Sequence, residues 1–241
     1  LQIANREASL LRTALTFQPW EEKALIYNLT AEQKTTWRFF LEGDDALALD
    51  NQVTLTVGRE PKQILLVGPG NFFLESCLRA LPGAALTRQP QITPADTAPY
   101  DLIIFDRTVP PTGVNGRIVL INTYFPEWER PVSKDGYYAP GRIWGETSHP
   151  LLRFVEFGNW RISKQLHFNL EGRTYLPVAS SPAGPILLTV EEPNRQTVLF
   201  CFDLFASNLP LQVSFPVLLS NLLSWLVPEP PGSNRVSLLP A

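Results

Sequence analysis

Methionine is absent from this sequence, and cysteine and histidine occur only twice each. The two cysteines, Cys77 and Cys201, are too few for a disulfide framework and do not form the C-x-x-C spacing of a zinc site. Both lie in apolar stretches, which predicts two buried thiols. The missing methionine and the leucine at position 1 lead us to expect a fragment of a longer protein.

Long apolar runs and basic clusters are also lacking. No run approaches the roughly 18 apolar residues that cross a bilayer, and no signal peptide is recognisable, so we expect a soluble chain. The net charge is −3 without a basic stripe, which argues against nucleic acid as a partner. With 241 residues, 44% of them hydrophobic and 18% charged, the sequence predicts a globular protein of one large or two ordinary domains.

Short strand patterns dominate residues 1–60. Aromatic and branched side chains gather at 24–29 and 36–41, and residues 52–57 alternate between apolar and polar side chains. A further short alternating piece covers residues 1–3. Several short strands separated by turns predict a partial immunoglobulin-like β-sandwich over residues 1–60.

The pattern changes after residue 62. Helical spacing of apolar residues appears at 72–81, with Asn71 as its N-cap, and again at 213–226. Continuous apolar runs predict buried strands of a parallel sheet, at residues 64–67, 102–105, 118–121 and 197–202. Together these elements predict an α/β domain with a doubly wound, mainly parallel sheet over residues 63–227. Residues 228–241 read as a proline-rich linker and the start of a further strand.

Five segments together resemble a known family. They are GDDALALDN (43–51), LLVGPGNFFLESCLRALPG (65–83), YDLIIFD (100–106), HPLLRFVEF (149–157), and FDL through SFPVLLSNLLSWL (202–226). Their order and spacing resemble the C-terminal region of bacterial aerotolerance proteins of the Bat type. The resemblance implies a class I glutamine amidotransferase-like domain with a flavodoxin-like sheet. It also implies a membrane-anchored parent protein that contains a von Willebrand factor A domain and holds this region outside the cytoplasm.

The catalytic residues of that domain class are missing from their expected places. In class I amidotransferases a cysteine follows a buried strand on a sharp turn, where glycines let the backbone approach the oxyanion. The matching turn here is Asn122-Thr123-Tyr124, without cysteine, serine or a flanking glycine. The His149-Pro150 pair lacks the glutamate that would complete a triad, and we interpret His149 as a structural or a binding-surface residue. The sequence therefore predicts no enzymatic activity.

Polar residues at the ends of buried strands are the candidate ligand-binding residues. Asp106, Asn122 and Asp203 lie at such ends, and ligands of open α/β sheets bind beyond them. Glu146 and His149, on the long irregular segment that follows, complete the candidate set. The alternative is that these side chains cap helices or bind loop amides.

No cofactor or metal site is predicted. The Gly68-Pro69-Gly70 turn has neither the third glycine of a dinucleotide motif nor a Lys-Ser/Thr pair. Asp44, Asp45 and Asp50 do not have the spacing of a calcium-binding EF-hand loop.

We expect a non-catalytic interaction or scaffold module with protein partners, and the oligomeric state stays open. The alternative is a ligand-binding or glycan-binding module, or a degenerate hydrolase, that uses the cleft at the carboxyl ends of the strands. The glycan alternative depends on aromatic side chains of the long segment, namely Tyr124, Trp128, Tyr137, Tyr138 and Trp144.

Overall fold

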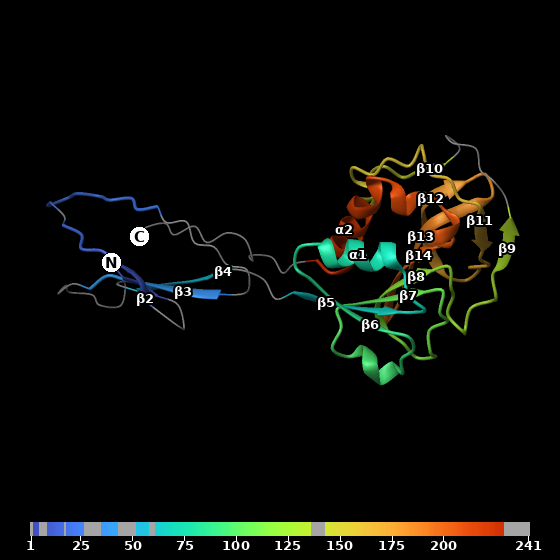
Figure 1. Cartoon of the computed structure of the whole chain (residues 1–241), viewed down its shortest axis with the longest axis horizontal. Coiled ribbons are helices and arrows are strands. Elements are labelled where there is room, and N and C mark those ends of the chain that lie inside the picture. The colour runs from blue at the N-terminus through green and yellow to red at the C-terminus, as the bar shows by residue number, and fades with distance from the viewer. Residues whose placement is uncertain are drawn as a thin grey trace. The chain divides into compact units, whose positions relative to one another are not determined.

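Two compact units make up the chain in the computed structural model (Figure 1). One consists of Leu1–Pro61 together with Pro230–Ala241, and the other of Lys62–Glu229. The structure describes residues 2–4, 9–16, 18–26, 35–42, 52–57, 61–135 and 143–228. Several sequence predictions lie outside the described residues: Asp44, Asp45 and Asp50 as calcium ligands, Tyr137 and Tyr138 as glycan contacts, and the strand near residues 236–239.

The first unit contains a four-stranded antiparallel sheet in the order β2-β1-β3-β4. Its strands are β1 (Gln2–Ala4), β2 (Ser9–Arg12), β3 (Thr35–Phe40) and β4 (Gln52–Val57). Three of the predicted strands are present within one residue, but Ala24–Ile26 do not form the strand predicted at 24–29. The described residues form a single sheet here, so the predicted two-sheet sandwich is not confirmed.

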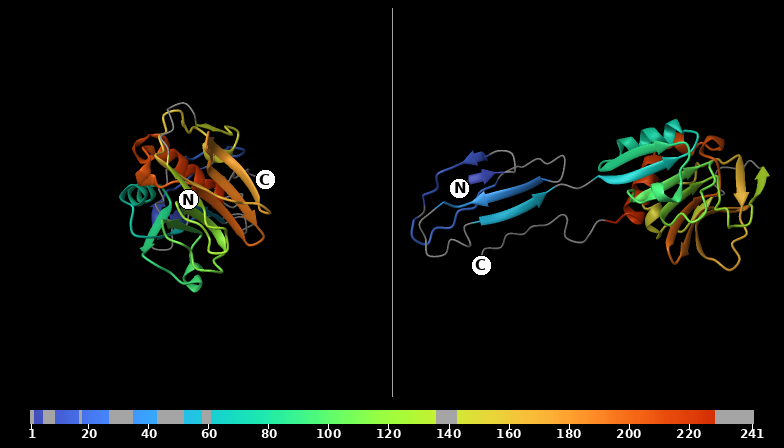
Figure 2. Two further views of the ribbon diagram at one scale, coloured as in Figure 1. Left: turned by 90° about the vertical axis from the view of Figure 1, so that its right-hand side faces the viewer. Right: turned by 90° about the horizontal axis from the view of Figure 1, so that it is seen from below.

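The second unit is built on an eight-stranded mixed sheet in the order β10-β12-β13-β14-β8-β7-β5-β6. Neighbours are parallel from β14 to β6 and antiparallel from β10 to β14, which confirms an α/β class with a mainly parallel sheet. Figure 2 shows β12 and β13, in orange, at the opposite side of the sheet from β5 and β6. The strands are β5 (Lys62–Val67), β6 (Ala84–Gln89), β7 (Leu102–Asp106), β8 (Gly116–Ile121), β10 (Trp144–Gly145), β12 (Thr174–Ser181), β13 (Gly184–Glu192) and β14 (Arg195–Phe200).

The last four residues of β5, β8 and β14 are buried and almost all apolar, because both faces of the sheet are covered there. Alternate residues of one strand enter two separate hydrophobic clusters, as in β5, where Ile64 and Leu66 face one layer and Leu65 and Val67 face the other. Each such buried aliphatic side chain contributes about 1.5–3 kcal/mol of transfer free energy, so these strands anchor the unit.

Helices α1 (Phe72–Ala80) and α2 (Ser214–Leu226) pack on the same face of the sheet (Figure 1). The Asn71 side chain accepts a hydrogen bond from the Leu74 amide at 3.2 Å, which confirms it as the N-cap of α1. Pro216 lies in the first turn of α2, where a missing amide hydrogen costs nothing.

The other face of the sheet is covered by irregular segments, which contribute Phe125, Trp128 and Leu170. A doubly wound sheet has helices on both faces, and this part of the prediction is not confirmed. β9 (Val132–Asp135) and β11 (Lys164–His167) pair as a separate two-stranded antiparallel ribbon. Four short 3₁₀ helices complete the described residues: η1 (Pro94–Thr97), η2 (Pro150–Leu152), η3 (Leu204–Ala206) and η4 (Leu209–Leu211). Within the described ranges, no helix has the length and apolar character needed to cross a membrane.

Candidate ligand-binding cleft

A cleft of about 480 Å³ opens at the carboxyl ends of the central parallel strands. Its walls come from the segments that follow β7, β8 and β14, together with the β9–β11 ribbon. This is the end of the sheet at which open α/β proteins bind ligands. The lining residues are Arg107, Val109, Asn122, Thr123, Tyr124, Arg130, Pro131, Lys164, Leu166, Asp203 and Ala206.

The turn after β8 contributes Asn122, Thr123 and Tyr124 to the cleft lining. Asn122 continues the strand ladder by donating its amide hydrogen to the Phe200 carbonyl at 3.0 Å. Its backbone then turns sharply, with φ at 51°, a left-handed conformation that asparagine tolerates better than most residues. Thr123 follows and is only 3% exposed. The chain therefore makes a sharp turn after β8 with an amide side chain at its apex.

The turn after β7 has a similar construction. Arg107 donates its amide hydrogen to the Ile121 carbonyl at 2.9 Å and also has a positive φ, 52°. Its side chain is held on three sides. The guanidinium donates to the Gly70 carbonyl at 2.8 Å, pairs with the Asp106 carboxylate at 3.1 Å, and lies over the Phe205 ring. The side chain is therefore fixed at the edge of the cleft.

Asp106, the partner of this arginine, is 1% exposed. Its Oδ2 atom accepts hydrogen bonds from Arg107 and, at 3.5 Å, from the Asn71 side chain. Burial raises the pKa of this carboxyl above its usual range, and the Arg107 charge and hydrogen bonds oppose that rise. The Asp106 carboxylate thus positions Arg107 and links it to the start of α1.

The strand order reverses beside β5, because β6 lies on one side of it and β7 on the other. Ligands often enter the crevice at such a reversal. Here the two loops pack directly against each other: a Cβ atom on Gly68 would lie 2.4 Å from the Asp106 carbonyl oxygen. Only glycine permits this approach, and the open cleft lies one strand further along, beyond β8.

β11 contributes Lys164 and Leu166 to the cleft lining and runs beside the segment after β14. Ser163 donates its amide hydrogen to the Ala206 carbonyl at 2.8 Å, and Leu166 donates to the Cys201 carbonyl at 2.7 Å. Between them, the buried Gln165 side chain donates to the Pro185 carbonyl at 2.7 Å. These bonds fix the backbone that carries Lys164 into the cleft lining.

The structure brings together part of the candidate set predicted from the sequence. Asn122 and Asp203 line the cleft, and Asp106 is not part of the lining but pairs with Arg107, which is. Asp203 also caps η3, because its Oδ1 atom accepts a hydrogen bond from the Phe205 amide at 2.9 Å. The strand-end residues therefore lie in the cleft lining or contact it. Asp203 also makes a capping hydrogen bond, which is the role that the alternative interpretation gives to these side chains.

Glu146 and His149 are not among the residues that line the cleft. Glu146 accepts a hydrogen bond from the Ser148 hydroxyl at 2.7 Å. The His149 ring lies 5.4 Å from the ring of Trp225 on α2, and its Nδ1 atom accepts a hydrogen bond from the Leu151 amide. Both residues stabilise the turn at η2, which favours the structural interpretation of His149.

Three cationic residues of the cleft were not among the sequence candidates: Arg107, Arg130 and Lys164. Arg107 directly follows the predicted strand-end aspartate, so its place at the same edge was available from the sequence. Arg130 and Lys164 reach the cleft through the β9–β11 ribbon, whose pairing leaves no mark in the local sequence pattern.

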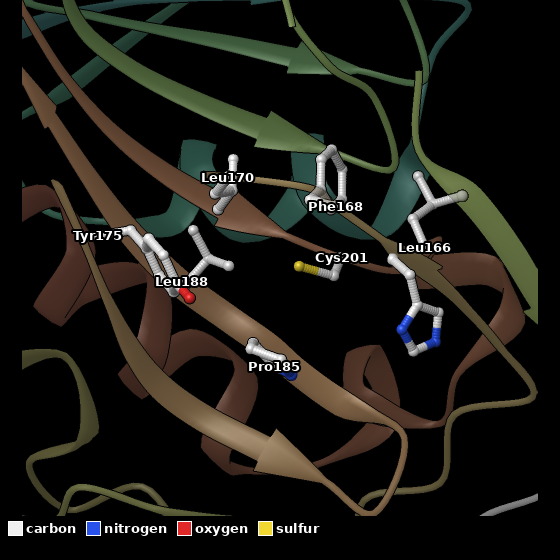
Figure 3. A pocket seen from close by; sticks show the side chains of 8 residues that line it. Leu166, Phe168, Leu170, Tyr175, Pro185, Leu188 and Cys201 are labelled. Atoms are coloured by element: carbon white, nitrogen blue, oxygen red, sulfur yellow. The ribbon is translucent and has the colours of Figure 1, made fainter. Parts of the chain in front are cut away.

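Both cysteines lie away from the cleft. Cys201 is 1% exposed and borders a separate small cavity of about 90 Å³, where its sulfur points between Leu170 and Leu188 (Figure 3). Burial raises the pKa of the Cys201 thiol far above its usual range and also raises the pKa of the half-buried Cys77. Neither thiol is activated for nucleophilic chemistry.

The cleft lining contains three cations, one carboxylate, and the neutral donors of Asn122 and Thr123. Among the described residues that line it there is no cysteine, serine or histidine. The lining is therefore polar and carries both signs of charge, and the Arg107 charge is already paired with the Asp106 carboxylate.

No family model and no curated protein matches this chain. Among solved structures, cytoplasmic protein STM1381 from Salmonella typhimurium LT2 is similar at 13% identity and a TM-score of 0.49, over 68% of this chain and 99% of that one. Cytoplasmic protein STM3548 from Salmonella typhimurium gives 13% identity and a TM-score of 0.47, over 79% and 96%. The mmIFT52 N-terminal domain gives 13% and 0.45, over 70% and 98%. With TM-scores below 0.5, these similarities assign neither a family nor a function.

Proposed function

We propose that this chain is a non-catalytic interaction module of a membrane-anchored bacterial protein, and that it binds through the cleft beyond β7, β8 and β14. In this proposal the second unit is an amidotransferase-like, flavodoxin-like domain, and the first unit is part of an immunoglobulin-like sandwich. The membrane anchor and the extracytoplasmic location rest on the sequence resemblance to Bat-type proteins.

The observation that supports the proposal most is the turn at Asn122. Nucleophiles of strand-turn enzymes sit on a sharp, strained turn after a central strand. Asn122 occupies such a turn after β8 with φ at 51°, and it lines the cleft. A carboxamide is neither a nucleophile nor a general base, so a turn of this shape serves binding in this chain.

Assays for turnover test the non-catalytic part of the proposal. We expect the 241-residue chain to hydrolyse glutamine and activated esters no faster than its Thr123→Ala variant, because Thr123 has the one aliphatic hydroxyl at the Asn122-Thr123-Tyr124 turn. Turnover by the wild type that Thr123→Ala abolishes would show a degenerate hydrolase instead.

A blocked cleft tests the binding part. Ala206 lines the cleft in η3, and Ala95 is an exposed alanine in η1, so Ala206→Trp and Ala95→Trp form a matched pair. In a ligand-observed NMR screen of small fragments, we expect hits that bind the wild type and Ala95→Trp but not Ala206→Trp. If no fragment distinguishes the two variants, the cleft is not a binding site.

The glycan-binding alternative receives less support. Trp128 is 4% exposed and packs edge-on against Phe125, so its face does not accept a sugar ring. Trp144 is exposed on β10, and Tyr124 lines the cleft. These aromatic side chains do not share one described surface, and stacking on a sugar depends on accessible faces.

A further inference from the structure

We propose that the cleft binds a second copy of this chain, and that each copy inserts an exposed phenylalanine into the cleft of the other. This inference rests on the proposed binding role of the cleft and names its partner. Three features carry it: a ridge of aromatic side chains beside the cleft, the exposed apolar area at the same end of the unit, and a surface that supplies both the inserted ring and the cavity.

The aromatic ridge consists of Phe72, Phe73 and Phe205. Phe72, the first residue of α1, is 75% exposed, and its ring meets the Phe73 ring edge-on with the centroids 5.9 Å apart. Phe73 meets Phe205 in the same way at 6.0 Å, and Phe205 is 51% exposed. Contact between large apolar rings and water is unfavourable, so the ridge gains free energy when another surface covers it.

The aromatic ridge leads directly to the cleft. The Phe205 ring lies over the guanidinium of Arg107, which is part of the cleft lining. The cleft volume of about 480 Å³ exceeds that of a phenyl ring. Five of its eleven lining residues have apolar or aromatic side chains, namely Val109, Tyr124, Pro131, Leu166 and Ala206. An inserted phenylalanine therefore finds apolar walls in the cleft.

Further exposed apolar side chains lie at this end of the second unit. Val109 follows β7, and Leu211 and Val213 follow β14. η3 contacts η4, so Leu211 continues the apolar surface from Phe205. With Phe72, these side chains expose on the order of 600 Å² of apolar area, near the upper end for the largest patch of a monomer. A stable interface of standard size buries about 800 Å² on each partner, so this area and the cleft walls are sufficient for a dimer.

The same surface supplies both halves of the contact. Phe205 touches Phe73 of the ridge and Arg107 of the cleft, so it lies between the protruding Phe72 and the cavity. In a dimer with twofold symmetry, each residue contacts its counterpart's neighbour reciprocally. A twofold axis near Phe205 places each Phe72 at the cleft of the other copy. The Arg107 charge does not oppose this approach, because it is paired with Asp106 at 3.1 Å.

Sedimentation equilibrium of the 241-residue chain over a range of concentrations tests the proposal. We expect a reversible equilibrium between monomer and dimer. Phe72→Ser removes the inserted ring, and Ala206→Trp fills the cavity that receives it. Because each contact occurs twice in the dimer, we expect either variant to weaken dimerisation by at least about a hundredfold. The matched controls are Phe154→Ser, at a phenylalanine that is 79% exposed, and Ala95→Trp. Neither position lines the cleft, and we expect both control variants to dimerise like the wild type.

A mixture of Phe72→Ser and Ala206→Trp tests reciprocal insertion. The first variant keeps an open cleft and the second keeps Phe72, so their heterodimer regains one of the two contacts. With one variant fluorescently labelled, we expect the mixture to associate about tenfold more tightly than either variant alone. No gain in the mixture would overturn reciprocal insertion.

A wild type that stays monomeric at every concentration would overturn the proposal, and so would equal weakening in the variants and their controls. If the wild type stays monomeric while fragments distinguish Ala206→Trp from Ala95→Trp, the binding role of the cleft stands and a second copy is not its partner. If neither dimer nor fragment binding is observed, the cleft is not a binding site.

Discussion

The guanidinium carbon of Arg107 lies 4.6 Å from the centroid of the Phe205 ring. Phe205 is also in edge contact with Phe73 of α1, so its position is fixed by the helix as well as by η3. The pair connects the packing of α1 to the placement of a cation at the cleft. The uncharged Phe205 ring therefore helps to fix the position of the Arg107 guanidinium.

The first prediction concerns this pair. Replacing Phe205 with leucine removes a cation–π contact of about 0.5–1 kcal/mol and lets the guanidinium move. We expect Phe205→Leu to weaken, about two- to fivefold, the binding of those fragments that Ala206→Trp excludes, as measured by ligand-observed NMR titration. Phe154→Leu is the control, because Arg153 lies over that exposed ring at 5.0 Å and neither residue lines the cleft. An equal loss in both variants would contradict the role given to Phe205.

The second prediction concerns the contact between the loops after β5 and β7. A Cβ atom on Gly68 would lie 2.4 Å from the Asp106 carbonyl oxygen, and neither backbone can withdraw without disturbing its strand. We expect Gly68→Ala to lower the free energy of unfolding of the second unit by about 3 kcal/mol. For Gly158→Ala, where nothing lies within 4 Å, we expect a change within about 1 kcal/mol. Urea unfolding of both variants is the measurement, and equal stabilities would refute the close contact.

The sequence predicts the central layer well because its signals are local. Ile64–Val67 and Ile118–Ile121 are continuous apolar runs, and each became a buried strand. Asn71 precedes a helical pattern and caps α1 as expected. Periodicity and capping depend on residues a few positions apart. They can therefore be recognised in a single sequence without knowledge of the tertiary structure.

The cleft was only partly predictable, for a physical reason. Asn122 and Asp203 were found because a strand end is a local feature. Lys164 enters the cleft on β11, which pairs with β9 across about thirty positions of sequence, and such a long-range contact leaves no local pattern. Both helices pack on one face of the sheet, and aromatic side chains such as Phe125 cover the other face. A buried strand has the same apolar pattern whether a helix or an irregular segment covers it, so the sequence does not distinguish these two arrangements.

The third prediction follows from the burial of Asp106. Its pKa is raised in the folded protein, so the folded state binds its proton more tightly than the unfolded state does. The stability that this proton provides is fully present below the unfolded pKa, near 3.9, and is lost as the pH rises through the folded pKa. We therefore expect the free energy of unfolding of the wild type, relative to Asp106→Asn, to fall as the pH rises across this window. A difference that grows with pH would mean that the Arg107 ion pair outweighs burial.

The fourth prediction concerns the thiols. Cys201 is 1% exposed with a raised pKa, and Cys77 is half-buried with a smaller barrier to modification. In the native chain we expect iodoacetamide to modify Cys77 slowly and to leave Cys201 intact, as measured by intact and peptide mass spectrometry. The Cys77→Ser variant isolates the second thiol and should react only in urea. Rapid native modification of Cys201 would contradict its inert, packed role.

The last prediction concerns His149 at the start of η2. Burial against Trp225 lowers the pKa of its imidazole, and the nearby Glu146 charge opposes this shift. Because Nδ1 accepts the Leu151 amide hydrogen, the neutral ring is the form that caps the turn. The stability that it contributes is therefore present above the unfolded pKa, near 6.5, and is lost as the pH falls through the folded pKa.

His149→Asn separates the proton from the cap. An asparagine side chain at this position still accepts the Leu151 amide hydrogen but does not titrate. We expect the wild type to lose stability relative to His149→Asn when the pH falls from 7 to 5, and His149→Ala, which has no acceptor, to be less stable than His149→Asn at both values. Thermal unfolding at the two pH values measures this. If the wild type and His149→Asn keep a constant difference, the ring does not titrate in this range and its role is packing against Trp225 alone.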